Sequence, residues 1–107
     1  MNSLHIEIFG HGPDLALLHG WGMHGGIWEG IRESLSERFR VHVVDLPGYG
    51  RSPACEPYTL ETLAQSVARA LPERTHVVGW SLGGQVALQW ARVDPQQIDK
   101  LILIGAT

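Results

Sequence analysis

The sequence predicts an α/β fold, a mostly parallel sheet with helices on both faces. Short segments rich in valine, isoleucine and leucine alternate along the chain with segments whose apolar residues recur at helical spacing. This alternation is typical of strands joined by helical crossovers, which leave the strands parallel. The 107 residues show no internal repeat or linker, so we expect a single domain with one core over residues 1–107.

Three strands and one helix are expected in the first half of the chain. Residues 4–9 alternate apolar and polar side chains, which is typical of a strand with one solvated face. Residues 15–20 and 41–45 are almost wholly apolar and are predicted as buried strands, the first running into a glycine loop. Apolar residues over 27–38 recur at helical spacing, which predicts an amphipathic helix between these two strands. The segment 46–57, with its glycines and prolines, is predicted to be a loop.

The second half continues the alternation of helix and strand. Thr59 is a suitable N-cap for the first helix, and Pro95 ends the second because the residue before a proline disfavours helical geometry. The predicted elements are a helix over 60–71, a strand over 75–80, a helix from 82 to about 93 and a strand over 101–106.

Composition excludes several classes of function. The formal net charge of −3 gives no electrostatic basis for binding nucleic acid or an anionic membrane. A single cysteine, Cys55, excludes an internal disulfide. No apolar run approaches the roughly 20 residues that span a bilayer, and the N-terminal residues lack the pattern of a secretion signal. We therefore expect a cytoplasmic protein.

The segment Gly79–Gly83 carries the motif G-x-S-x-G between a predicted strand and a predicted helix. A tight turn in that position presents the serine, here Ser81, at the top of the sheet. The following helix directs its first amides and the positive end of its dipole to the same place, so the Leu82 N–H is a natural donor to an oxyanion. The alternative is an ordinary turn in which Ser81 only caps the helix.

A second oxyanion donor is expected in the loop after an earlier strand. Residues 19–22 read His-Gly-Trp-Gly, and their glycines allow the sharp turn that would direct the Trp21 N–H toward the serine. Alternatively, Trp21 covers the core from a glycine-rich turn. The two interpretations are compatible, because the donor is the backbone and the indole remains free to line a pocket.

Three segments occur in a familiar order: LLHGWG at 17–22, DLPGYGRS at 45–52 and GWSLGGQVA at 79–87. Together they resemble the N-terminal half of an α/β-hydrolase core. The first and third are similar to those of the esterases that hydrolyse the methyl ester of pimeloyl-acyl carrier protein in biotin synthesis. The resemblance implies that Ser81 is the nucleophile, that the Trp21 and Leu82 amides form the oxyanion hole and contact the substrate, and that no cofactor is needed. It also implies acyl carrier protein as a partner.

The activating partners of Ser81 are missing from the 107 residues. In this superfamily the triad acid and then the histidine follow the serine, yet after Ser81 there is no histidine, and the acids are only Asp94 and Asp99. We expect the triad Asp and His to come from sequence outside this chain. The chain alone should then be nearly inactive, since loss of the base in a comparable serine hydrolase costs about 10⁶ in kcat. The strand over 101–106 would also form an uncapped sheet edge that invites self-association.

Upstream residues offer weaker alternatives for the missing roles. His19 and His24 lie at the correct sheet edge for a base, although we expect the His19 ring to fix the oxyanion loop by a hydrogen bond and His24 to be solvated. Asp45 ends its strand and is expected to organise the following loop rather than serve as the triad acid. The six histidines show no metal-ligand spacing. The glycines of the 48–50 segment lack the third glycine of a dinucleotide-binding loop.

Two other functions remain open at this stage. One is another reaction on the same scaffold, such as acyl transfer to an alcohol or hydrolysis of a C–C bond. The other is a non-catalytic binding module that keeps the fold without the chemistry. The intact G-x-S-x-G motif favours an enzyme, and the lack of a histidine after Ser81 favours the binding module.

Overall fold

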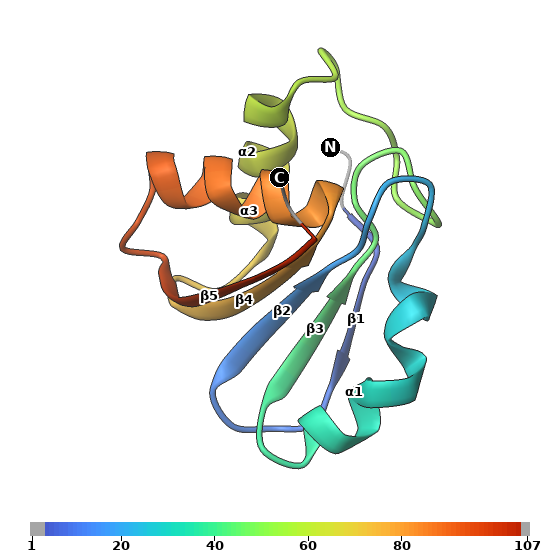
Figure 1. Ribbon diagram of the computed structural model, residues 1–107, viewed down its shortest axis with the longest axis vertical. Helices are drawn as coiled ribbons and strands as arrows, with labels where there is room; N and C mark the ends of the chain where they lie inside the picture. Colours follow the sequence, from blue (N-terminus) through green and yellow to red (C-terminus); the bar gives the residue numbers. More distant parts are fainter. Residues whose placement is uncertain (1–3, 106–107) are drawn as a thin grey trace.

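The computed structural model describes residues 4–105, which form a sheet with helices on both of its faces (Figure 1). The elements are β1 (Ile6–Phe9), β2 (Asp14–Leu18), the 3-10 helix η1 (Gly25–Trp28), α1 (Glu29–Ser36), β3 (Arg40–Val44), α2 (Leu60–Ala70), β4 (Thr75–Trp80), α3 (Leu82–Val93) and β5 (Ile98–Ile104). Of these elements, β4 and α3 have the bounds predicted from the sequence.

The strands of the described chain lie in the order β1-β3-β2-β4-β5. β1 is antiparallel to β3, and the other neighbours are parallel, so the mostly parallel sheet is confirmed. Leu18 at the end of β2 pairs with Val44 at the end of β3 and with Gly79 near the end of β4. The loops that follow these three strands therefore begin at the same edge of the sheet.

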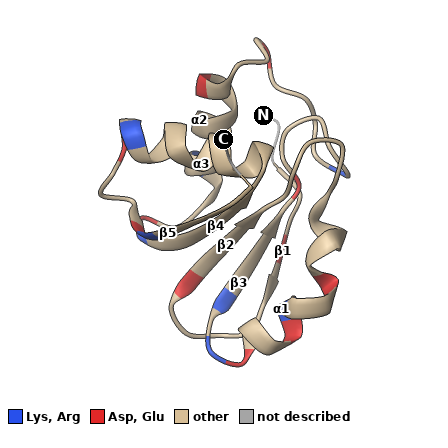
Figure 2. Ribbon diagram, viewed as in Figure 1, with Lys and Arg blue, Asp and Glu red and all other residues tan. Residues whose placement is uncertain are grey.

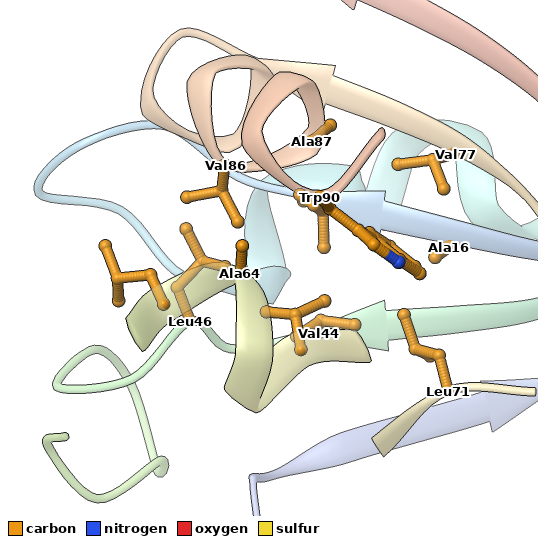
Figure 3. Packing of buried hydrophobic residues seen from close by; sticks show 12 residues of the cluster. Ala16, Val44, Leu46, Ala64, Leu71, Val77, Val86, Ala87 and Trp90 are labelled. Carbon is orange, nitrogen blue, oxygen red and sulfur yellow. The ribbon is translucent and has the colours of Figure 1, made fainter. Parts of the chain in front are cut away.

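The hydrophobic core has two parts, one on each face of the sheet, rather than the single core expected. On one face α2 and α3 pack over β2, β3 and β4, with the fully buried Trp90 at the centre of the cluster (Figure 3). On the other face η1 and α1 cover a smaller cluster that includes Leu17, Val43 and Trp28. Successive residues of β2 alternate between the two clusters, as the pleat requires.

The Gln97 side chain links α3 to the end of α2. The buried Trp90 indole N–H donates to the Gln97 Oε1 at 2.8 Å. The Gln97 Nε2 donates to the carbonyl oxygens of Ala68 and Pro72, each at 2.9 Å. Because the side chain is only 8% exposed, these bonds satisfy polar groups that water would otherwise have to reach. Gln97 thus ties α3 to the end of α2.

Two elements differ from the prediction. The helix expected over 27–38 begins as η1 at Gly25, where the His24 Nδ1 caps the Gly26 N–H, and continues as α1 to Ser36. No residue of α1 is fully buried, so the helix packs only loosely against the sheet, with Leu35 partly buried against the smaller cluster. The last strand begins at Ile98, earlier than position 101, because polar residues face solvent in its first half.

The edges of the sheet are β1 and β5. Within the described chain β5 pairs with β4 alone, and Ile102, Leu103 and Ile104 are 56%, 39% and 45% exposed. The expected apolar sheet edge is therefore present. β1 was expected to have one solvated face, but Ile8 and Glu7 are both exposed although they point to opposite faces. None of the described helices has the length and apolarity to cross a bilayer.

Candidate active site

Ser81 lies in the turn between β4 and α3 and has an unusual backbone conformation. Its φ of 57° and ψ of −114° make it the one non-glycine residue with positive φ in residues 4–105. Such a conformation costs about 1–3 kcal/mol and is retained only where surrounding contacts enforce it. One of those contacts is the Ser81 N–H, which donates to the Ile104 carbonyl on β5 at 2.8 Å.

The Ser81 side chain is not used as a helix cap. It occupies the N-cap position of α3, yet its hydroxyl makes no capping hydrogen bond. Thr59, at the same position of α2, has an extended backbone, and its Oγ1 accepts from the Thr62 N–H at 3.1 Å. The prediction for Thr59 is confirmed, and the capping alternative for Ser81 is wrong.

Glycines allow the loop after β2 to approach this turn. A Cβ on Gly83 would lie 2.6 Å from the His19 carbonyl oxygen and closer still to that of Leu18, so α3 rests directly on the end of β2. A Cβ on Gly20 would lie 3.3 Å from the Ser81 Cβ. Gly20 is therefore next to the serine, and the orientation of the following Trp21 N–H toward it stays a prediction.

His19 links this loop to the end of β3. The ring is fully buried. The Leu46 N–H donates to Nε2 at 2.9 Å, so Nε2 carries no proton. Nδ1 must then be the protonated nitrogen, and it donates to the Gly20 carbonyl at 2.8 Å. The expected ring hydrogen bond is present, and with both nitrogens engaged His19 is not available as a general base.

The electrostatics of the His19 site agree with a neutral ring. Burial lowers the pKa of His19 below its ordinary value of 6.5, and this effect outweighs the opposing hydrogen bond to Gly20 and the charge of Asp45. The Tyr49 ring packs edge-on against the imidazole, with centroids 5.3 Å apart. The loop 46–57, which carries Tyr49, thus covers one side of the histidine.

Asp45 organises the neighbouring loops, as predicted. Its buried carboxylate accepts from the Gly25 N–H at 2.6 Å and from the Arg51 N–H at 3.0 Å. A Cβ on Gly50 would collide with the same carboxylate, which explains the glycine there. Because both oxygens are engaged by backbone amides, Asp45 fixes the loops after β2 and β3 rather than orienting a histidine.

The other predicted site groups lie around Ser81. Trp21 is 74% exposed, so the alternative in which it covers the core is wrong. Leu82 begins α3, and neither its amide nor that of Trp21 has a hydrogen-bond partner among residues 4–105. Figure 2 shows charged residues on α1 and α2, at the beginning of β2, β3 and β5, near the end of α3 and in the loop after β3, where Asp45 and Arg51 lie. The first turn of α3 itself carries no charged side chain, and the Leu82 and Trp21 amides next to Ser81 are unused within residues 4–105.

The remaining histidines lie outside this group. His42 is buried near the start of β3 and contacts the Asp14 carboxylate at 2.8 Å. His76, near the start of β4, has its Nε2 3.9 Å from Asp99. His24 is exposed, as expected, although its Nδ1 also accepts from the Gly26 N–H at 3.0 Å. In the described part of the chain, no three ligating side chains come together as a metal site.

One feature of this region was missed by sequence reasoning. The Ser52 hydroxyl donates to the Asp45 carbonyl, while its oxygen accepts from the His5 N–H at 2.9 Å. Ser52 is 8% exposed and lies 47 residues from His5 in the chain. No local pattern marks a loop serine for such a role, because its partners are brought together only by the pairing of β1 with β3.

Comparison with known proteins places this geometry in a family. The sequence profile of the alpha/beta hydrolase fold matches residues 14–107. The pimeloyl-[acyl-carrier protein] methyl ester esterase of Nitrosomonas europaea is 51% identical over 107 residues, which are 100% of this chain and 42% of that protein. The esterase of the same name from Aeromonas hydrophila is also 51% identical, over 98% of this chain and 42% of its own length. The chain thus spans less than half of these relatives.

Solved structures agree with the sequence relatives. A marine microorganism esterase superposes with a TM-score of 0.91 at 28% identity, covering 96% of this chain and 41% of its own. The fold of this chain is thus a known one, and the match extends over almost the whole of the chain. This chain belongs to the α/β hydrolase fold family.

Proposed function

We propose that the protein is a serine carboxylesterase and that Ser81 is its nucleophile. One observation carries the proposal: Ser81 is held at positive φ beside the Gly20 loop while its hydroxyl is not used as a cap. A serine with only a structural role would gain from the ordinary N-cap conformation. Backbone strain that no structural hydrogen bond of the side chain explains is typical of functional positions.

In this proposal the Ser81 Oγ attacks the carbonyl carbon of an ester and gives its proton to a general base. The carbonyl oxygen becomes an oxyanion that accepts from the Leu82 and Trp21 amides, a type of stabilisation worth about 2.7–4 kcal/mol per donor. The bond to the alcohol then breaks, the alcohol leaves with the proton, and the acyl group remains on Oγ. Water attacks that acyl group in the same way and releases the acid.

We propose the methyl ester of pimeloyl-acyl carrier protein as the substrate, with methanol as the leaving group. The support is the name shared by the relatives at 51% identity. The first turn of α3 carries no charge, which suits a neutral methyl ester, and the exposed Trp21 ring offers an apolar surface for an acyl chain. The reaction would then belong to biotin synthesis, and acyl carrier protein would be the partner that delivers the substrate.

We propose that the general base and its acid partner come from sequence outside these 107 residues, which match 42% of the Nitrosomonas europaea esterase. No histidine follows Ser81 in the 107 residues, and the His19 ring is fully engaged. The chain by itself should therefore show almost no esterase activity, with a deficit of about 10⁶ in kcat. That deficit is a consequence of the missing base rather than of a defective nucleophile.

A chimera tests this function directly. Residues 1–107 would replace the matching segment of the Nitrosomonas europaea esterase, which would supply the remainder of that chain. Methanol release from pimeloyl-acyl carrier protein methyl ester and hydrolysis of p-nitrophenyl butyrate would be measured beside the Ser81→Ala variant and the Ser36→Ala control. We expect activity that Ser81→Ala abolishes and Ser36→Ala leaves unchanged.

Two results would contradict the proposal. A folded chimera that is inactive on both esters would favour a non-catalytic module, and activity that persists in Ser81→Ala would place the nucleophile elsewhere. Hydrolysis of p-nitrophenyl butyrate without action on the carrier-bound ester would retain Ser81 as nucleophile and overturn the substrate. Acyl transfer to an added alcohol in preference to water would favour the acyltransferase alternative.

A further inference from the structure

We propose that Ser52 is a positioning residue for the Trp21 amide, acting through a one-way relay of hydrogen bonds that passes through His19. The inference rests on the proposed function only in giving the Trp21 N–H the role of oxyanion donor. The relay consists of hydrogen-bond donors, acceptors and peptide planes. Its members lie in the loop after β2, the loop after β3 and the segment before β1.

The relay begins at the start of β1. The His5 N–H donates to the Ser52 Oγ at 2.9 Å, so the Ser52 hydroxyl proton is directed elsewhere, to the Asp45 carbonyl. That carbonyl belongs to the Asp45–Leu46 peptide, whose N–H donates to the His19 Nε2 at 2.9 Å. Both ends of this one peptide are therefore occupied, the oxygen by Ser52 and the nitrogen by His19.

The second half of the relay repeats the arrangement. Because Nε2 accepts, the His19 proton is on Nδ1, which donates to the Gly20 carbonyl at 2.8 Å. That carbonyl belongs to the Gly20–Trp21 peptide. In a trans peptide the C=O and the N–H point in opposite directions, so holding the Gly20 oxygen against His19 fixes the direction of the Trp21 N–H. A flip of this peptide would break a buried hydrogen bond.

Every donor in the chain of bonds has the same sense. Donation to a peptide oxygen makes the N–H of that peptide more acidic, and donation to one imidazole nitrogen does the same for the N–H of the other. Bonds aligned in this way strengthen one another by about 10–30% each. The relay therefore both orients the Trp21 N–H and makes it a better donor, and neither Ser52 nor His19 needs to touch a substrate.

Burial protects the relay from competition by water. His19 is 0% exposed, and Ser52 is 8% exposed. The Tyr49 ring forms a T-shaped contact with the imidazole, with the two centroids 5.3 Å apart. The carboxylate of Asp45 holds the adjacent backbone through Gly25 and Arg51, so the peptide that carries the relay cannot turn freely.

Nuclear magnetic resonance of the 107-residue chain tests the relay without requiring catalysis. In the unaltered chain, ¹⁵N spectra should show His19 protonated on Nδ1 only, with a scalar coupling across the hydrogen bond between the Leu46 amide nitrogen and Nε2. In Ser52→Ala, the Leu46 and Trp21 amide protons should shift upfield while the His19 tautomer is retained. Ser36→Ala is the matched control, because its hydroxyl also donates to a backbone carbonyl, that of Glu33.

The possible results separate clearly. A proton on Nε2, or no coupling to Leu46, would overturn the relay in the unaltered chain even if Ser52→Ala failed to fold. A Trp21 amide proton that does not move in folded Ser52→Ala, or moves equally in Ser36→Ala, would also overturn it. A relay that is present while the chimera is inactive in all variants would instead refute the proposed esterase function, so the two failures are distinguishable.

Discussion

Replacing Gly83 with alanine tests the close approach that builds the site. Gly83 has ordinary helical geometry within α3, so a side chain there is opposed by space and not by backbone strain. Its Cβ would lie 2.6 Å from the His19 carbonyl oxygen and nearer to that of Leu18. These atoms are backbone at the end of a central strand, and they cannot yield as the end of a flexible side chain would. The first turn of α3 must therefore move away from β2.

The expected cost follows from two opposing effects. Alanine in place of glycine within a helix gains about 1 kcal/mol. Overpacking costs about 1–3 kcal/mol and occasionally more. Because the clash is with backbone, we expect the overpacking cost of Gly83→Ala to be about 3 kcal/mol or above. The net loss of stability is about 2 kcal/mol, which for a domain of this size lowers Tm by roughly 10 °C.

Gly30 provides the matched comparison. It is an exposed glycine in α1, and outside its chain neighbours and the backbone of its own helix no described atom lies within 4 Å of the position of its Cβ. Gly30→Ala should therefore show only the helical gain of about 1 kcal/mol, and Tm should rise by roughly 4–8 °C. Thermal unfolding followed by circular dichroism measures both variants. A Gly83→Ala chain as stable as the unaltered one, or an equal loss in Gly30→Ala, would refute the packing argument.

The same substitution has a consequence for the chemistry. In the chimera, a displaced α3 would carry Ser81 and the Leu82 amide away from the Gly20 loop. A misplacement of about 1 Å at a reacting group can cost about 100-fold in rate. We expect kcat/KM of folded Gly83→Ala chimera to fall by about that factor, while Gly30→Ala retains full activity.

Four further substitutions or conditions give independent tests. Ser81→Gly relieves the positive φ and should raise the free energy of unfolding by about 1 kcal/mol, measured by urea denaturation; a lower value would show that the turn is not strained. Gln97→Ala leaves a buried indole N–H unpaired and should cost about 3 kcal/mol in the same assay, whereas the exposed neighbour Gln96→Ala should be nearly neutral. The pKa of His19 is lowered in the folded chain, so below pH 6.5 the unfolded chain binds more protons than the folded one. The free energy of unfolding should therefore keep its full value above pH 6.5 and fall below that pH by at most about 1.4 kcal/mol per pH unit. The fall should be less steep in His19→Gln. The exposed β5 edge should cause self-association at high concentration that Ile102→Lys reduces, as judged by size exclusion with light scattering; a monomer at every concentration would contradict this.

Periodicity explains which elements could be predicted from the sequence. The buried residues of α3 share one face of the helix, whereas β4 is a short apolar run packed on both faces of the sheet, and in both cases the predicted bounds are those of the structure. β5 begins earlier than predicted because Asp99 and Lys100 lie on an exposed edge strand, where polar residues are tolerated and the period of two is lost. The helix predicted from position 27 begins at Gly25 as a 3-10 turn, since a side-chain cap from His24 rather than apolar spacing starts it.

The candidate site divides in the same way between local and non-local causes. The turn at Ser81 was predictable because its motif, its strand and its helix are contiguous in the chain. The hydrogen bonds that hold the opposing loop were not, because they join Ser52 to His5 and Leu46 to His19 across 47 and 27 residues. Only strand order brings these pairs together. A motif can therefore identify the proposed nucleophile, whereas the direction of the proposed second oxyanion donor depends on the sheet. The ends of β2 and β3 lie level, and any change that shifts their register should disturb the Trp21 amide before it disturbs Ser81.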